Sequence, residues 1–239
     1  YEVTSVSVLH ACLAAVLFEC KSGVLRPILH FECHGHPEKG MQIGSSKEYL
    51  TWSELQRIVG AFNKVTRNHC AVVVAACYGY ALSRGLDVSK PCPFNYLIAP
   101  SEEMLAGAFA DTMSVFYRTV ASSGDLITGL KAFPSEMQLV VAGEWFYSNL
   151  GSYLINHYTQ RERQQIAEEV VSRHVAAQPG LNRAQRRAQL KQVRKTAKQR
   201  VGDTRQMANH FATTFFHGSP PVGVDEFVEW VRAVKASKG

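Results

Sequence analysis

Short apolar runs alternate with longer amphipathic stretches over the first part of the chain. In the clearest run, 70–76, the residues Ala71 to Ala75 are all apolar, which is typical of a strand buried on both faces. Similar runs predict three further strands. In chain order these are 26–33, 94–99 and 137–142.

The amphipathic stretches between these runs have helical spacing. Thr51 with Glu54 three positions later has the spacing of a capping box and predicts a helix start, and Ser101 is expected to cap another helix that ends near Gly124. Strands that alternate with helices indicate a mostly parallel sheet with helices on both faces. We therefore expect an α/β domain over residues 1–143.

The pattern changes after Gly143, where strand-like runs give way to helical ones. We expect residues 144–239 to form an α-helical C-terminal extension. Its predicted helices cover 145–177, 182–200 and 224–236.

Charge is concentrated in this extension. Residues 173–205 hold ten Lys and Arg against the single acid Asp203, so this segment accounts for more than the whole net charge of +6. The apolar fraction of 46% supports a substantial core, and no apolar run reaches the roughly 18–20 residues of a membrane span. Six cysteines without framework spacing, and no secretory signal, indicate reduced thiols in the cytoplasm, with no membrane partner.

Two predicted strands end in residues that carry chemistry. The first is followed by His34-Gly35, and the central one by Cys77 and then Gly79. A thiolate nucleophile needs a nearby base, which His34 supplies near neutral pH. Backbone N–H groups of Gly35 and Cys77 would then bind the developing oxyanion. His36, in the following loop, is the competing base.

This combination resembles caspase-like cysteine peptidases (clan CD), most closely their bacterial CHAT-type members. The similarity rests on His-Phe-Glu-Cys-His34-Gly35, on Val-Val-Ala-Ala-Cys77-Tyr-Gly79, and on the stretch from Asn95 to about residue 130. The resemblance implies a caspase-like fold over roughly residues 5–143. It also implies a Cys77 nucleophile with His34 as its proton carrier, and oxyanion donors at Gly35 and Cys77.

The activity implied is that of an endopeptidase that cuts a protein substrate and is controlled by an upstream activator, with no cofactor. Ala75 stands where animal caspases carry Gln and where metacaspases carry Asp. The preference for the residue before the scissile bond therefore stays open. Three acidic residues are candidates for selecting a basic residue there: Asp87, Glu102 and Asp111.

Three alternatives accompany this hypothesis. A metal site at Cys33, His34, His36 and His69-Cys70 is disfavoured, since no Cys-x-x-Cys pair exists and neighbouring strand residues point to opposite faces. The fold could also act as a catalytically silent scaffold.

Finally, the basic helix 182–200 could bind nucleic acid or an acidic partner. A solvated or partner-facing helix is favoured over a nucleic-acid-binding one, because no aromatic residues interleave with its charges.

Overall fold

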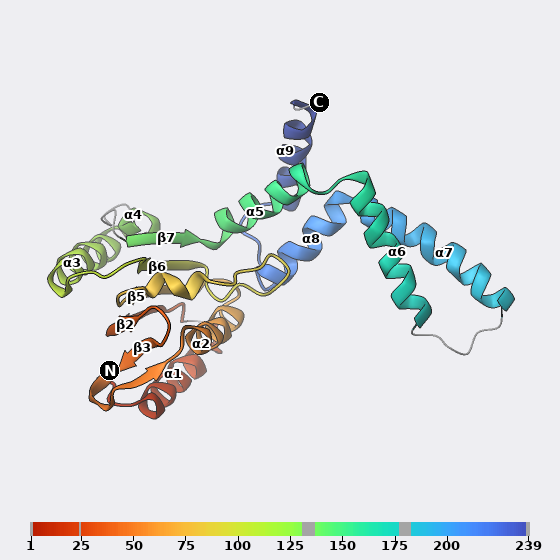
Figure 1. Cartoon of the computed structure of the whole chain (residues 1–239). Coiled ribbons are helices and arrows are strands. Elements are labelled where there is room, and N and C mark those ends of the chain that lie inside the picture. The colour runs from red at the N-terminus through yellow and green to blue at the C-terminus, as the bar shows by residue number, and fades with distance from the viewer. Residues whose placement is uncertain (1, 24, 131–136, 177–182, 238–239) are drawn as a thin grey trace. The chain divides into compact units, whose positions relative to one another are not determined.

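The computed structural model divides into two compact units, which are described separately (Figure 1). The first unit comprises residues 1–87 and 91–144, and the second comprises 88–90 and 145–239. The residues that the structure describes are 2–23, 25–130, 137–176 and 183–237.

A four-stranded sheet forms the centre of the first unit. Its strand order is β1 (Ile28–Glu32), β5 (Ala71–Ala75), β6 (Tyr96–Pro100) and β7 (Met137–Val141). The β1, β5 and β6 strands run parallel, whereas β7 pairs with β6 in the antiparallel direction. The unit is thus α/β with a mixed, mostly parallel sheet, as expected from the alternation of strands and helices. All five residues of β5 are buried, in agreement with its continuous apolar sequence.

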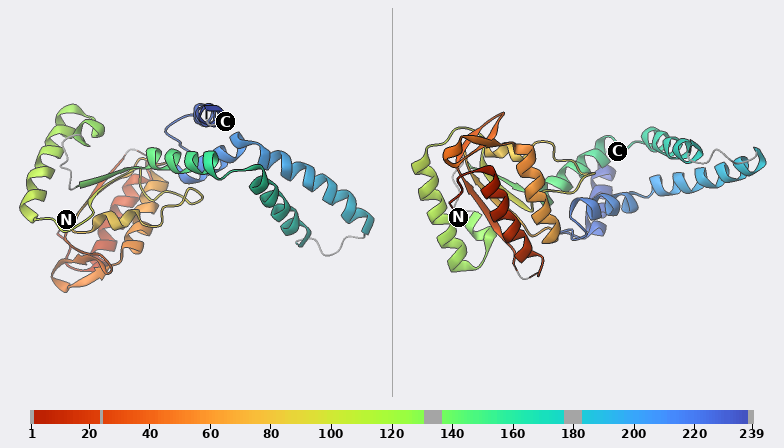
Figure 2. Two further views of the ribbon diagram at one scale, coloured as in Figure 1. Left: turned by 45° about the horizontal axis from the view of Figure 1, so that its top comes forward. Right: turned by 90° about the horizontal axis from the view of Figure 1, so that it is seen from below.

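Helices lie on both sides of this sheet (Figure 2). On one side, Phe109, Met113 and Phe116 of α3 (Ala106–Ser123) pack with Val73 and Ile98 of the sheet. The helices α1 (Val6–Cys20) and α2 (Trp52–Val65) lie next to each other on the other side. Side chains alternate along a strand, so each face of β5 contributes to a separate apolar layer.

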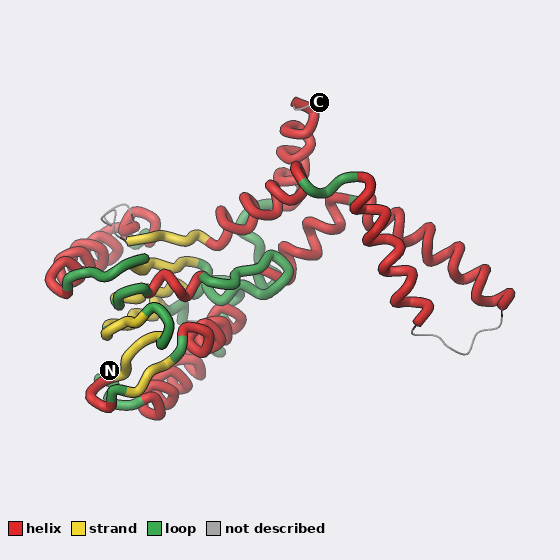
Figure 3. The backbone as a smooth tube through the Cα atoms, in the orientation of Figure 1, coloured by secondary structure: helices red, strands yellow, loops and turns green. Residues whose placement is uncertain are grey.

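A small antiparallel sheet follows β1. It contains β2 (His34–His36), β3 (Gly40–Ile43) and β4 (Glu48–Leu50), with a short 3₁₀ helix, η1 (Gly44–Ser46), between the last two. The predicted first strand, 26–33, is observed as β1, whereas the residues from His34 to His36, expected in a loop, form the strand β2. Figure 3 shows these strands beside the central sheet.

Local signals explain where several helices begin. Thr51 accepts a hydrogen bond from the Glu54 N–H, and the Glu54 carboxylate accepts one from the Thr51 N–H, so the predicted capping box is confirmed. Ser5 caps α1 by accepting from the Val8 N–H. The prediction for Ser101 is wrong: α3 begins at Ala106, because the carbonyl of Glu102 accepts the Tyr78 N–H and holds this segment against the turn after β5.

The second unit is helical over its described residues. Its helix α5 begins within the first unit, directly after β7, and the predicted single helix over 145–177 is broken at 157–159. The helices are α5 (Ala142–Asn156), α6 (Gln160–Ala176), α7 (Arg183–Gly202), α8 (Thr204–Phe215) and α9 (Val224–Ser237). The predicted Pro179-Gly180 break lies outside the described residues.

Aromatic side chains form the core that joins α5 to α8. Phe146 is fully buried, and its ring centroid lies 4.8 Å from those of both Phe215 and Phe216. Trp145 stacks on Phe215 at 5.7 Å. Burial of these large apolar rings stabilises this part of the second unit.

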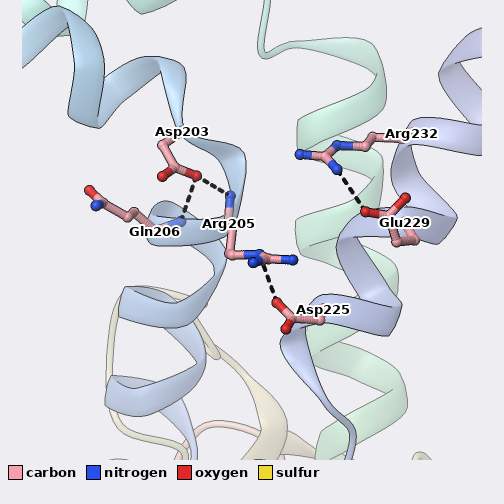
Figure 4. Close-up of polar contacts among 6 residues, drawn as sticks. All are labelled: Asp203, Arg205, Gln206, Asp225, Glu229 and Arg232. Carbon is pink, nitrogen blue, oxygen red and sulfur yellow. Dashed lines mark hydrogen bonds and ion pairs between the residues drawn. The ribbon is translucent and has the colours of Figure 1, made fainter.

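Polar contacts fix the start of α8 and join it to α9 (Figure 4). The Asp203 carboxylate accepts hydrogen bonds from the N–H groups of Arg205 and Gln206, which satisfies the helix start. The Arg205 guanidinium pairs with Asp225 of α9 at 2.8 Å. The helices α6 and α7 lie side by side as an antiparallel hairpin with an apolar seam of Ala167, Val171 and Ala197. Within the described ranges, no helix is both long and apolar enough to cross a membrane.

Candidate active site

The turn after β5 presents Cys77 at the carboxyl end of a buried parallel strand, the edge at which open α/β sheets bind ligands. Tyr78 adopts the left-handed conformation with a φ of +61°, which is uncommon for a residue with a side chain. Gly79 follows, and a Cβ there would lie 2.7 Å from Cγ1 of Val74. The chain can therefore turn sharply after Cys77 only because residue 79 has no side chain.

The His34-Gly35 segment packs directly on this turn. A Cβ at Gly35 would lie 3.0 Å from the backbone nitrogen of Cys77 and 2.9 Å from its carbonyl carbon, and it would overlap the carbonyl oxygen. The parallel pairing of β1 with β5 produces this contact, since Glu32 is in register with Ala75 and the Cys33 N–H lies 3.4 Å from the Ala75 carbonyl. The structure thus brings together the backbones of the two predicted strand ends.

His34 is solvent-exposed at the first position of β2, next to Gly35. It lines a cavity of about 620 Å³ together with the end of β1 and the apolar face of α1. Two carboxylates, Glu2 and Glu32, line the same cavity. The imidazole is therefore accessible to a molecule that enters from this side.

The Cys77 thiol is half-buried, and its Sγ lies 3.8 Å from the carbonyl oxygen of Met104. The segment before α3 is held against the same turn by two further hydrogen bonds. The Tyr78 N–H donates to the Glu102 carbonyl at 3.2 Å, and the Tyr78 hydroxyl donates to the Glu103 carboxylate at 3.2 Å. Of the predicted selector acids, Glu102 contacts this turn through its backbone carbonyl and has an exposed side chain, and Asp111 is exposed on α3.

Burial changes the acidity of three other cysteines, Cys33, Cys70 and Cys92. Burial, with smaller contributions from Cys77 and Glu32, raises the pKa of Cys33 to about 12. Burial also raises the pKa values of Cys70 and Cys92 to about 12. The direction of these shifts favours the protonated thiol over the nucleophilic thiolate at neutral pH. The proximity of Cys33 to Cys77 was missed from sequence, because it follows only once the two strands are known to pair in this register.

His36, the competing base, and His30 on β1 both make hydrogen bonds within the fold. The Nδ1 of His36 lies 3.1 Å from the Glu38 N–H and 3.2 Å from the Lys39 N–H, so this ring is used to close the turn after β2. On β1, His30 shares a hydrogen bond of 2.7 Å with the Tyr117 hydroxyl. Each of these two imidazole rings thus has a hydrogen-bond partner within the fold.

The disfavoured metal site gains no geometric support. The Nδ1 of His69 lies 2.9 Å from the Thr66 carbonyl and 2.8 Å from that of Arg67, and Cys70 is buried. Among the described residues, no three His, Cys, Asp or Glu side chains are grouped so as to hold an ion.

Comparisons with known proteins give no relative. No protein-family profile matches the chain, and no curated protein sequence or solved structure shows significant similarity to it. The functional argument therefore depends on the residues and their geometry.

Proposed function

We propose that this protein is a cysteine endopeptidase of caspase-like type, with Cys77 as nucleophile and His34 as general base and acid. The observation that carries the proposal is the close packing of Gly35 on the backbone of Cys77. Two segments distant in sequence, one with His34 and one with Cys77, thereby meet at the carboxyl edge of a parallel sheet, which supports a dyad of these two residues.

In the proposed acylation step, the His34 imidazole takes the thiol proton of Cys77, and the Sγ thiolate forms a bond to the carbonyl carbon of the scissile peptide. The carbonyl oxygen becomes an oxyanion that accepts hydrogen bonds from the N–H groups of Gly35 and Cys77. The oxyanion then collapses and the C–N bond breaks. The imidazolium proton passes to the leaving amine, which leaves a thioester on Cys77.

In the proposed deacylation step, the imidazole acts first as a base toward water and then as an acid toward the leaving sulfur. His34 takes a proton from a water molecule, whose oxygen attacks the thioester carbonyl. The C–S bond then breaks, the acid product leaves, and the proton on His34 returns to the sulfur of Cys77. No cofactor takes part in either step.

The surroundings of the turn support an enzyme over a silent scaffold. Cys77 is half-buried and His34 is exposed, so both remain accessible to a substrate. All six thiols are free, which suits a reducing cytoplasm. The substrate is a protein cut at few sites, and control by an upstream activator belongs to the same proposal through the resemblance to CHAT-type peptidases.

A peptide-library and proteome cleavage assay tests the proposal. The wild type should cut a limited set of peptides, Cys77→Ala should cut none of them, and the matched control Cys12→Ala should behave like the wild type. Equal cleavage by the wild type and by Cys77→Ala would refute the nucleophile assignment.

A further inference from the structure

The positive charge of the second unit is concentrated on one helix. Between Arg183 and Gly202, α7 contains eight Lys and Arg and no Asp or Glu. Its neighbour α6 is balanced, with three Arg and three Glu. The charge of the hairpin is therefore carried almost entirely by α7.

Packing against α6 leaves a row of these cations exposed. Leu190, Val193 and Ala197 of α7 pack on the apolar seam of the hairpin. Arg187, Lys191 and Lys195 are all exposed. Because they are spaced four residues apart, they follow one another along the helix surface at intervals of about 6 Å.

Where the structure describes both side chains, the ion pairs made by the acids of α6 involve Arg194 of α7 and Arg173 of α6 itself. Arg194 donates to the Glu168 carboxylate at 3.2 Å, and Arg173 pairs with Glu169 within α6. Both pairs are exposed and contribute little to stability. The row of Arg187, Lys191 and Lys195 thus extends along a flank of α7 beside the side that α6 occupies.

The lack of Trp, Tyr and Phe on α7 disfavours nucleic acid that binds by stacking its bases, as single strands do, but it does not disfavour the phosphate backbone of a duplex. An interfacial helix also needs large apolar residues on its outer face, and protein hot spots are enriched in Trp and Tyr. A phosphate backbone needs only cations and hydrogen-bond donors. Gln192 and Gln199, both exposed, add amide donors to the same helix.

We propose that the exposed row of Arg187, Lys191 and Lys195 on α7 binds the phosphate backbone of a duplex nucleic acid without base recognition. This inference is independent of the peptidase proposal, since it uses none of the residues near Cys77. Each phosphate contact releases condensed counterions, so loss of three contacts reduces the slope of log affinity against log salt concentration by about 2.7.

The test is fluorescence anisotropy of the full chain with a short labelled DNA duplex of mixed sequence, repeated with an RNA duplex, as salt rises from about 50 to about 200 mM. The variant combines Arg187→Gln, Lys191→Gln and Lys195→Gln, because Gln removes the charge and keeps a good helix former. A matched control combines Lys21→Gln, Arg57→Gln and Lys64→Gln, three exposed cations of the first unit. Circular dichroism of both variants confirms that the helices remain.

We expect the wild type and the control to bind either duplex with steep salt dependence. Over this salt range they should lose about 40-fold more affinity than the α7 variant. Three results would overturn the proposal: no binding at the lowest salt, equal loss in both variants, or equally strong binding of polyglutamate or anionic vesicles. The last would assign the helix to an acidic protein or to a membrane surface.

Discussion

Gly35 and Cys77 meet backbone to backbone, although one lies after β1 and the other after β5. A side chain at residue 35 would occupy the position of the Cys77 carbonyl group. The contact explains why glycine stands next to His34, and it is the geometric basis for proposing a dyad at this edge of the sheet.

Gly35→Ala should therefore displace the turn that carries Cys77. The added methyl group meets backbone atoms, which cannot move aside as a flexible side chain can. We expect a loss of about 1–3 kcal/mol in the free energy of unfolding and the loss of any Cys77-dependent peptidase activity. Chemical denaturation and the cleavage assay measure the two effects.

Gly60→Ala is the matched control for that substitution. A Cβ at Gly60, within α2, would lie 3.7 Å from Cα of Pro93, which is an ordinary contact. Alanine in a helix interior should then stabilise the protein by about 0.5–1 kcal/mol. Equal stability of Gly35→Ala and Gly60→Ala would contradict the described packing.

Cys33 should be much less reactive than its position near the surface suggests. Its pKa is raised to about 12, chiefly by burial, so its thiolate form is scarce at neutral pH. We expect mass spectrometry of iodoacetamide-treated native protein to find Cys33 unmodified near neutral pH. Modification of Cys33 before Cys77 under these conditions would contradict the raised pKa of the Cys33 thiol.

His30 should make stability depend on pH. Although His30 is partly exposed, desolvation of its ring lowers its pKa below 6.5, and the charge of Glu32 offsets this only in part. As pH falls below about 6.5, the unfolded chain takes up a proton at His30 before the folded protein does, so stability that is present above this pH is lost. The Tyr117 hydroxyl, whose pKa burial raises to about 12, remains protonated throughout and can donate to the neutral ring.

His30→Gln tests whether His30 causes this loss of stability at acidic pH. Thermal midpoints measured at about pH 7.5 and about pH 5 should differ less for the variant than for the wild type. If the thermal midpoint of the variant decreases between these two pH values as much as that of the wild type or more, groups other than His30 cause the loss of stability in acid.

Phe146→Ala should destabilise the second unit strongly. The ring is fully buried between Phe215 and Phe216, and removal of a buried Phe side chain costs about 3–5 kcal/mol. Arg205→Gln, which removes an exposed ion pair with Asp225, should cost at most about 1 kcal/mol. Calorimetry measures both losses. A larger loss of stability in Arg205→Gln than in Phe146→Ala would contradict this account.

Sequence patterns located most elements of the first unit, because burial and capping leave local signatures. The apolar run of β5 and the capping box of α2 are examples. Apolar runs do not encode strand direction, so the antiparallel pairing of β7 was not foreseen. The late start of α3 was missed because the Tyr78–Glu102 hydrogen bond, a tertiary contact, outweighs the local capping preference of Ser101.

For the candidate site, the sequence predicts residues but not their surroundings. The burial of Cys33 beside Cys77 and the use of His36 in a turn depend on pairing between distant segments. The helix α8 is not predicted either, since its capping residue Asp203 stands out in the sequence only as the lone acid of a basic segment.

The rate at which iodoacetamide alkylates Cys77 near neutral pH tests the central proposal most directly, because it requires neither a substrate nor an activator. Mass spectrometry can follow all six cysteines in the native wild type, in His34→Ala and in the control His36→Ala. We predict that Cys77 reacts first in the wild type and in the control, and at least about tenfold more slowly in His34→Ala, where the base is missing. A Cys77 that reacts no faster than Cys12, or at the same rate without His34, would contradict the proposed dyad.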